Sequence, residues 1–286
     1  MNPHNLLVFT DMDGSLLDHH SYSHAAADAM LAGLEQQKIP VIANTSKTRA
    51  ELEVLRDELN NSHPFIAENG AAVYLPKKRF PQQPTDTTSY GNYWVKPFAK
   101  PRSHWQALIA DIAPKFEGMF VTFAQAGIKG IAEMTGLDRD KAQLAADREY
   151  GEPVKWLGDA EQKTVFFAEL EARGAHILHG GRFSHISDHC DKGKALGWLK
   201  SQYEQLRSQE SSFISVALGD SQNDVAMLDA ADYAIIIKSP EHQAPVLLNH
   251  KVKLANHTLF VTQSYGPEGW VEGINHVFDR LNIEQH

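Results

Sequence analysis

The chain has 286 residues, of which 42% are hydrophobic and 22% charged, and its formal net charge is -9. This length allows two domains with a large core, and the composition is that of an ordinary globular protein. The negative charge argues against a nucleic-acid partner, because general phosphate-backbone binders need clustered Lys and Arg. The single cysteine, Cys190, excludes an intramolecular disulfide and favours a reducing compartment. Neither a signal-peptide pattern nor a run of membrane-spanning length is found, so we expect a cytoplasmic protein without a membrane partner.

The first part of the chain alternates strand and helix patterns, which is typical of βαβ units and a parallel sheet. An apolar run at residues 6–10 predicts a first strand, and a helix is expected over residues 25–37 with Ser23 as its N-cap. A second strand at residues 40–43 and a second helix follow. The alternation therefore favours an α/β fold from the first residues onward.

An antiparallel hairpin is expected next, because Asn69-Gly70 lies between the apolar runs 65–67 and 71–75 and this dipeptide favours positive φ angles. Residues 76–91 contain three prolines and few large apolar side chains. We interpret them as the connection into a second domain.

The middle of the chain has a mixed pattern of its own, with strands expected at 119–124, 176–178 and 183–186 and helices at 137–149 and 159–172. Strand and helix patterns alternate again afterwards, at 192–206, 213–218, 225–230 and 233–237. We predict a doubly wound, Rossmann-like parallel sheet core formed by residues 1–82 and 189–286. An α+β cap domain, residues 83–188, is inserted in its middle.

Polar turns follow three of the predicted strands: Asp11-Met12-Asp13-Gly14-Ser15, Asn44-Thr45-Ser46-Lys47 and Gly219-Asp220-Ser221-Gln222-Asn223-Asp224. Ligands bind outside the carboxyl ends of the strands in open α/β sheets. In Asp191-Lys192-Gly193-Lys194 a lysine stands at the start of a predicted helix, where the ammonium and the helix N-terminus both favour a bound phosphate. Neighbouring carboxylates repel one another unless a hard cation joins them, and Mg²⁺ favours carboxylate and phosphate oxygens. These segments together predict a Mg²⁺-dependent phosphoryl site.

The four segments, in this order, resemble the four motifs of the haloacid dehalogenase superfamily of phosphatases. The turn at Glu68-Asn69-Gly70 and the insertion point resemble the branch of that superfamily with the larger α/β cap. Four further segments are similar to the mannosyl-3-phosphoglycerate phosphatase family: Met134-Thr135-Gly136-Leu137, Arg148-Glu149-Tyr150, Gly180-Gly181-Arg182-Phe183-Ser184-His185 and Gly266-Pro267-Glu268-Gly269-Trp270. The resemblance covers nearly the whole chain.

The resemblance implies a phosphomonoesterase that converts mannosyl-3-phosphoglycerate, a small phosphorylated substrate, into mannosylglycerate and phosphate. Asp11 would be the nucleophile that forms an aspartyl-phosphate, and Asp13 the general acid and base. Thr45 would hold the phosphoryl oxygens, and Lys192 would balance their charge.

The resemblance also implies a metal site and substrate contacts. Mg²⁺ would be held by Asp11, Asp220, Asp224 and the backbone carbonyl of Asp13. The residues expected to bind substrate or to orient the metal shell are Ser46, Lys47, Arg182, His185 and Asn223. The sequence indicates no oligomeric state.

Several alternatives stay open at this point. Thr45 and Ser46 are both suited to cap the helix that begins near Lys47, and the spacing does not decide which hydroxyl faces the phosphate. Arg182 and His185 lie on an alternating segment that places them on opposite faces of a strand.

Other functions also fit parts of the pattern. A glucosyl-3-phosphoglycerate phosphatase or a broader sugar phosphatase of the same branch would use the same motifs. A phosphomutase would isomerise its substrate with little net release of phosphate. A noncatalytic metabolite-binding module is disfavoured, because it has no need of an acid/base beside a nucleophile.

Overall fold

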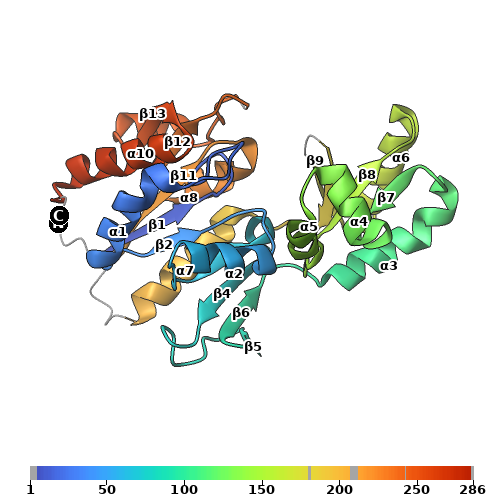
Figure 1. Ribbon diagram of the computed structural model, residues 1–286, viewed down its shortest axis with the longest axis horizontal. Helices are drawn as coiled ribbons and strands as arrows, with labels where there is room; N and C mark the ends of the chain where they lie inside the picture. Colours follow the sequence, from blue (N-terminus) through green and yellow to red (C-terminus); the bar gives the residue numbers. More distant parts are fainter. Residues whose placement is uncertain (1–4, 180–181, 207–211, 242, 285–286) are drawn as a thin grey trace. The chain divides into compact units, whose positions relative to one another are not determined.

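The computed structural model describes residues 5–179, 182–206, 212–241 and 243–284. The chain forms two compact units (Figure 1). The first contains Met1–Thr45, Asn61–Lys96 and Asp191–His286, and the second contains Ser46–Asn60 and Pro97–Cys190. Residues 83–96, which we expected in the cap, thus fall in the first unit, and residues 46–60, expected in the core, fall in the second.

A five-stranded parallel sheet forms the centre of the first unit, in the order β13-β12-β11-β1-β2. Its strands are β1 (Leu6–Thr10), β2 (Val41–Ala43), β11 (Ile214–Gly219), β12 (Tyr233–Lys238) and β13 (Leu259–Tyr265). The chain passes from β1 to β2 on one side and from β11 through β12 to β13 on the other. This reversal makes a topological switch point beside β1, where α/β sheets bind ligands.

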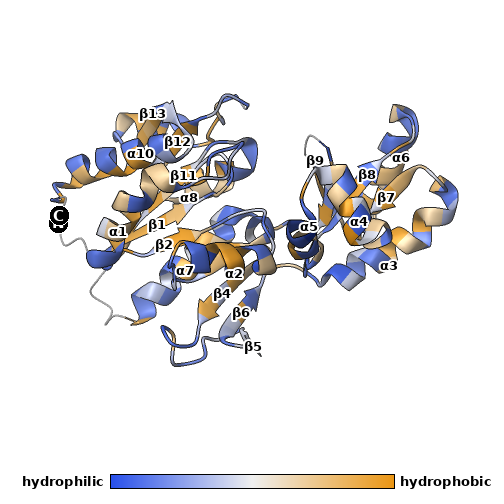
Figure 2. Ribbon diagram, in the orientation of Figure 1, coloured by the Kyte–Doolittle hydropathy of each residue, from blue (hydrophilic) through white to orange (hydrophobic). Residues whose placement is uncertain are grey.

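Helices surround this sheet: α1 (Asp28–Gln36), α7 (Lys192–Leu206), α8 (Val225–Ala230), α9 (His250–Ala255) and α10 (Gly266–Leu281). Because parallel crossovers are right-handed, α1 and α8 lie on opposite faces. Figure 2 shows hydrophobic residues along β1 and β2, and all five residues of β1 are buried. The doubly wound α/β core that the sequence predicts is confirmed. The helix at 25–37 is confirmed in part, because Ala25–Ala27 is a 3-10 turn and the N-cap of α1 is Ala27, not Ser23.

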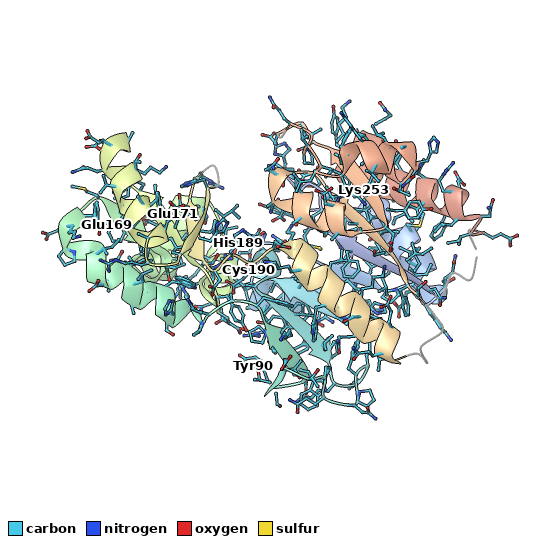
Figure 3. The ribbon with its side chains drawn as sticks, turned by 180° about the vertical axis from the view of Figure 1, so that it is seen from behind. Tyr90, Glu169, Glu171, His189, Cys190 and Lys253 are labelled. Carbon is cyan, nitrogen blue, oxygen red and sulfur yellow. The ribbon has the colours of Figure 1, made fainter. Side chains whose placement is uncertain are left out.

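A second, antiparallel sheet of the first unit has the order β3-β4-β6-β5. Its strands are β3 (Phe65–Ala67), β4 (Ala72–Pro76), β5 (Thr88–Tyr90) and β6 (Tyr93–Pro97). The hairpin at Asn69-Gly70 is confirmed, with both residues at positive φ. The interpretation of residues 76–91 as a connection is wrong, because β5 and β6 extend the hairpin sheet. β5 is an exposed edge strand, and Tyr90 (Figure 3) is 48% exposed, so this strand lacks the apolar pattern of a buried one.

The second unit is built on an antiparallel sheet of order β7-β8-β10-β9. Its strands are β7 (Phe120–Thr122), β8 (Glu152–Trp156), β9 (His176–His179) and β10 (Ser184–Ser187), and its helices are α2 (Arg49–Glu58), α3 (Arg102–Ile112), α4 (Phe123–Thr135), α5 (Arg139–Ala146) and α6 (Ala160–Glu171). A buried apolar cluster that includes Trp105, Ile109 and Phe166 forms its core. The sequence did not predict α3, α4 or β8, and the predicted helix at 137–149 ends at Ala146. Within the described part of the chain, no helix has the length and apolar character to cross a membrane.

Candidate active site

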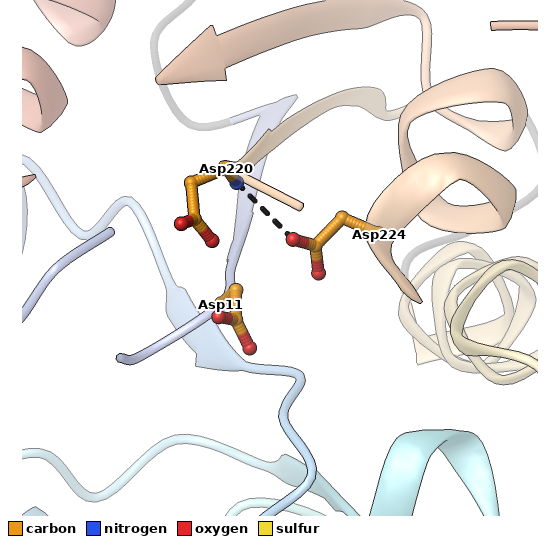
Figure 4. Close-up of side chains that lie close together, drawn as sticks. All are labelled: Asp11, Asp220 and Asp224. Carbon is orange, nitrogen blue, oxygen red and sulfur yellow. Dashed lines mark hydrogen bonds between the residues drawn. The ribbon is translucent and has the colours of Figure 1, made fainter. Parts of the chain in front are cut away.

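Three aspartates meet at the carboxyl ends of β1 and β11 (Figure 4). Asp11 directly follows β1, Asp220 directly follows β11, and Asp224 lies in the turn before α8. The parallel register pairs Thr10 with Leu218, so the two strands end at the same edge of the sheet. One carboxylate oxygen from each aspartate lies within 4.8 Å of the others, and all three residues are buried. The structure therefore brings together acids that are more than 200 residues apart in sequence.

Local hydrogen bonds fix the backbone around these acids. The Thr10 hydroxyl donates to the Asp11 carbonyl at 2.6 Å, and the indole N–H of Trp270 donates to the Thr10 hydroxyl at 3.0 Å. Asp224 Oδ2 accepts the backbone N–H groups of Asp220 and Ser221, both at 3.1 Å. Trp270 thus supports the first motif through Thr10, a role that the sequence alone did not reveal.

Lys192 is buried between two of the acids. Its Nζ donates to Asp11 Oδ1 at 2.7 Å and to Asp224 Oδ1 at 2.6 Å. Burial lowers the pKa of Lys192, but the two carboxylates outweigh it and hold the pKa well above its ordinary value. The lysine therefore stays positively charged at neutral pH. The single ammonium contacts two of the three carboxylates and leaves Asp220 without a direct ion pair.

Asp220 is the acid of the cluster that Lys192 does not contact. Its Oδ2 is buried and has no hydrogen-bond partner among the described residues. Burial raises the pKa of this carboxyl to about 7, and the negative charges of Asp11 and Asp224 act in the same direction. Gly14 has a φ of +78°, and a Cβ at this position would lie 2.7 Å from Asp220 Oδ2. Glycine thus keeps space beside an unbonded carboxylate oxygen, and this donor set fits a hard divalent cation such as Mg²⁺.

Asp13 is half-buried, and its carboxylate is not part of the aspartate cluster. Its backbone pairs with Leu17 in a short bridge that closes the turn after β1. The expected contribution of Asp13 to the metal through its backbone carbonyl stays a prediction.

The second motif follows β2. Thr45 is buried, its N–H donates to the Ile66 carbonyl at 3.2 Å, and its carbonyl accepts the Asn69 N–H at 2.8 Å. Thr48, not Thr45 or Ser46, is the N-cap of α2, where it forms a capping box with Glu51. The interpretation that Thr45 or Ser46 caps this helix is therefore wrong. Ser46 and Lys47 are half-buried.

Two asparagines join the motifs of the first unit. Asn44 Nδ2 donates to the Lys192 carbonyl at 3.0 Å, which ties the end of β2 to the start of α7. Asn223 Nδ2 donates to Asn69 Oδ1 at 3.3 Å, and Asn223 Oδ1 accepts the Ser221 hydroxyl at 2.5 Å. The sequence predicted a turn at Asn69 and a polar motif at Asn44, but it did not predict these side-chain contacts.

The predicted substrate residues of the cap lie in the second unit. Arg182 is exposed and donates to the Thr135 carbonyl at 2.9 Å, at the end of α4. Burial lowers the pKa of His185 to about 3, and the positive charge of Arg148 acts in the same direction. Gly180 and Gly181, from the same motif, lie outside the described residues. Cys190 (Figure 3) is half-buried and its thiol donates to the Asp188 carbonyl at 3.2 Å.

Comparison with known proteins agrees with this geometry. A family model described as haloacid dehalogenase-like hydrolase matches residues 8–90, and one described as sucrose-6F-phosphate phosphohydrolase matches residues 169–278. Among solved structures, a haloacid dehalogenase-like hydrolase from Bacteroides thetaiotaomicron is 15% identical with a TM-score of 0.63, covering 96% of this chain and 98% of that one. A haloacid dehalogenase subclass IIB sugar phosphatase is 16% identical with a TM-score of 0.59, covering 97% and 99% of the two chains. At these identities the structures show the shared fold.

The haloacid dehalogenase-like hydrolase model and a curated phosphatase relative define the class: this chain belongs to the haloacid dehalogenase-like phosphatases. Within that class, it is 38% identical to the glucosyl-3-phosphoglycerate/mannosyl-3-phosphoglycerate phosphatase of Methanococcoides burtonii. The match covers 96% of this chain and 98% of the relative. The chain therefore belongs to the same family as that phosphatase.

Proposed function

We propose that this enzyme hydrolyses the phosphate monoester of mannosyl-3-phosphoglycerate to mannosylglycerate and phosphate, with Mg²⁺ as its cofactor and the cytoplasm as its location. The buried group of Asp11, Asp220, Asp224 and Lys192 supports the reaction type. The name of the M. burtonii relative, together with 38% identity over 96% of the chain, supports the substrate.

In the proposed first step, a carboxylate oxygen of Asp11 forms a bond to phosphorus while the ester bond to the glycerate oxygen breaks. Asp13 donates its proton to the leaving oxygen, so mannosylglycerate departs as a neutral hydroxyl. The product on the chain is an aspartyl-phosphate, which divides one difficult displacement into two easier ones.

In the second step, Asp13 takes a proton from a water molecule whose oxygen forms a bond to phosphorus. The bond to Asp11 breaks, inorganic phosphate leaves, and both aspartates return to their starting states. Thr45 donates a hydrogen bond to the phosphoryl oxygens during both steps, and Lys192 offsets the negative charge that Asp11 and the phosphoryl group share.

Asp11, Asp220, Asp224 and the Asp13 carbonyl would hold Mg²⁺, with Asn223 supporting this arrangement. When bound, the ion would neutralise charge on the phosphoryl oxygens and on the attacking and leaving groups. The observation that supports a divalent cation is the buried group of three carboxylates that share one ammonium.

Ser46, Lys47, Arg182 and His185 are proposed to contact the substrate beyond its phosphoryl group. The cap residues among them belong to the second unit, which we propose is the specificity unit of the enzyme. The predicted cap boundaries at residues 83 and 188 differ from those of this unit, which contains Ser46–Asn60 and Pro97–Cys190.

A substrate panel tests the function. Purified protein with Mg²⁺ is assayed for phosphate release from mannosyl-3-phosphoglycerate, glucosyl-3-phosphoglycerate, mannose 6-phosphate and sucrose 6F-phosphate. We expect the highest kcat/KM for mannosyl-3-phosphoglycerate, and none of the four to be hydrolysed in EDTA. A higher kcat/KM for glucosyl-3-phosphoglycerate, which the relative's name also includes, would change the sugar but keep the reaction. Similar values for all four would replace the proposal with a broad sugar phosphatase.

A further inference from the structure

Arg148 and Glu149 are the part of the cap motifs that the proposed chemistry does not use. They lie in the irregular connection 147–151 between α5 and β8, not in a helix or a strand. A residue in such a connection keeps a fixed position only if other groups hold its backbone.

Arg102, at the start of α3, holds this backbone. Its Nε lies 2.5 Å from Glu152 Oε2, and Glu152 is fully buried. A second guanidinium nitrogen donates to the Ala146 carbonyl at 2.8 Å, and the Arg102 backbone N–H donates to the Glu149 carbonyl at 2.7 Å. Arg102, which is half-buried, thus holds both ends of the connection, and the Arg148 side chain starts from an immobilised backbone.

The connection and the end of α5 are also joined to the second motif and to the start of α2. Arg148 donates to the Ser46 carbonyl at 2.9 Å, and the Thr48 hydroxyl donates to the Leu144 carbonyl at 2.9 Å. Arg49 Nε donates to Glu149 Oε1 at 2.7 Å. These contacts, all inside the second unit, explain why residues 46–60 cluster with residues 97–190.

The contact to Ser46 has a geometric consequence. Because the peptide unit is planar, fixing the direction of the Ser46 carbonyl also fixes the direction of the Lys47 N–H. Backbone N–H groups ahead of a helix are suited to bind phosphate oxygens. Burial lowers the pKa of His185 to about 3 with a further contribution from Arg148, so His185 is neutral and does not repel the guanidinium.

We infer that Arg148 is a positioning residue for phosphoryl transfer, which acts by fixing the Ser46-Lys47 peptide directly after Thr45. The inference rests on the proposed function, in which Thr45 binds the transferring phosphoryl group. Arg148 acts on the phosphoryl end of the site, and its contribution is therefore the same for every phosphate monoester, whatever the rest of the substrate.

The test compares Arg148→Ala and Arg148→Lys with unaltered protein on p-nitrophenyl phosphate and mannosyl-3-phosphoglycerate. The matched control is Arg173→Ala, which removes an arginine of the same unit that pairs with Asp111 and lies near Glu169. We expect Arg148→Ala to lower kcat/KM by about 10- to 100-fold for both substrates, because small misplacements of a binding group have effects of this size. The ratio of kcat/KM for the two substrates should be the same in Arg148→Ala as in the unaltered protein. Arg148→Lys should lower kcat/KM less than Arg148→Ala does. Added guanidinium ion should restore part of the activity of Arg148→Ala. Arg173→Ala stays at the level of the unaltered protein.

Other outcomes overturn the inference. A loss confined to mannosyl-3-phosphoglycerate would mean that Arg148 binds the remainder of the substrate. Full activity of Arg148→Ala on both substrates would mean that the Ser46 peptide does not depend on it. If the unaltered protein hydrolyses p-nitrophenyl phosphate but not mannosyl-3-phosphoglycerate, the proposed substrate fails, and mannose 6-phosphate takes its place in the comparison of ratios.

Discussion

Buried charge is balanced in the second unit and unbalanced in the first. In the second unit, both oxygens of Glu152 have donors: Oε1 accepts from Arg102 and the Ala124 N–H, and Oε2 accepts from Arg102 and Gln106. In the first unit, three carboxylates share one ammonium and Asp220 Oδ2 has no donor among the described residues. A balanced buried pair holds elements together, whereas an unbalanced cluster is suited to bind a cation and a reacting group.

The largest effect is expected from Asp11→Asn, which removes the proposed nucleophile. Turnover of p-nitrophenyl phosphate with Mg²⁺ should fall by about 10⁴-fold or more, as for loss of a nucleophile in other enzymes. Circular dichroism should show an unchanged fold, because Asn occupies the same volume. The control is Asp28→Asn, an exposed acid of the same unit. Normal turnover by Asp11→Asn would falsify the nucleophile assignment.

Lys192→Met should destabilise the first unit, because it leaves three buried carboxylates without a counter-charge. Removal of one partner from a buried ion pair costs about 3–5 kcal/mol in the free energy of unfolding. Mg²⁺ should recover part of this loss in urea denaturation. Glu152→Gln should also destabilise the protein, but Mg²⁺ should not recover that loss. An equal response of the two variants to Mg²⁺ would contradict the difference between the units. Lys200→Gln, which breaks a partly exposed pair with Asp232, should cost at most about 1 kcal/mol.

The pKa of Asp220 predicts a pH dependence of stability in the metal-free protein. This carboxyl titrates at about 7 in the folded chain, above its ordinary value of 3.8. Between these values the folded state holds a proton that the unfolded state has lost, so the free energy of unfolding decreases as pH rises through this window. The contribution is on the order of 3 kcal/mol, and Mg²⁺ should oppose it by binding the ionised form. Urea denaturation at pH 5 and pH 8, in EDTA and in Mg²⁺, measures it. Asp220→Asn should lack this pH-dependent part of the free energy of unfolding. If the pH dependence persists in that variant, another group causes it.

The smallest effect is expected in the second unit, from Arg182→Gln. This exposed arginine is proposed to contact the substrate beyond the phosphoryl group, so KM for mannosyl-3-phosphoglycerate should rise by about 10-fold, as for loss of one charged contact. Kinetics with p-nitrophenyl phosphate should not change. A change in kcat for both substrates would place Arg182 with the catalytic groups and weaken the division of roles between the units.

The fold of the first unit was easier to predict than that of the second, because its strands have local apolar patterns. The strands at 6–10 and 213–218 are buried on both faces, and continuous apolar runs predict such strands well. The helix at 192–206 matches α7 at both ends. By contrast, β8 contains Glu152, whose burial depends on Arg102, 50 residues away. No local pattern indicates a buried acid in a strand.

The two helices of the second unit that were not predicted, α3 and α4, do have local helix signals in the sequence. α4 contains Gly127 and Gly130, which disfavour helix, yet its capping box of Thr122 and Gln125 was visible in the sequence. α3 has Trp105, Ile109 and Ile112 at helical spacing, and Pro101 directly precedes it. Tertiary packing into the core of the second unit outweighs these local preferences.

The reaction class could be predicted from four ordered motifs, three after apolar runs and one at a helix start, because such motifs are local features of the chain. How these motifs share charge depends on the fold. The fold places Lys192 between Asp11 and Asp224, leaves Asp220 Oδ2 without a donor among the described residues, and joins Arg148 to the Ser46 carbonyl. Hydrophobic periodicity depends on near neighbours in the chain, whereas the energy of a buried charge depends on every group around it in space.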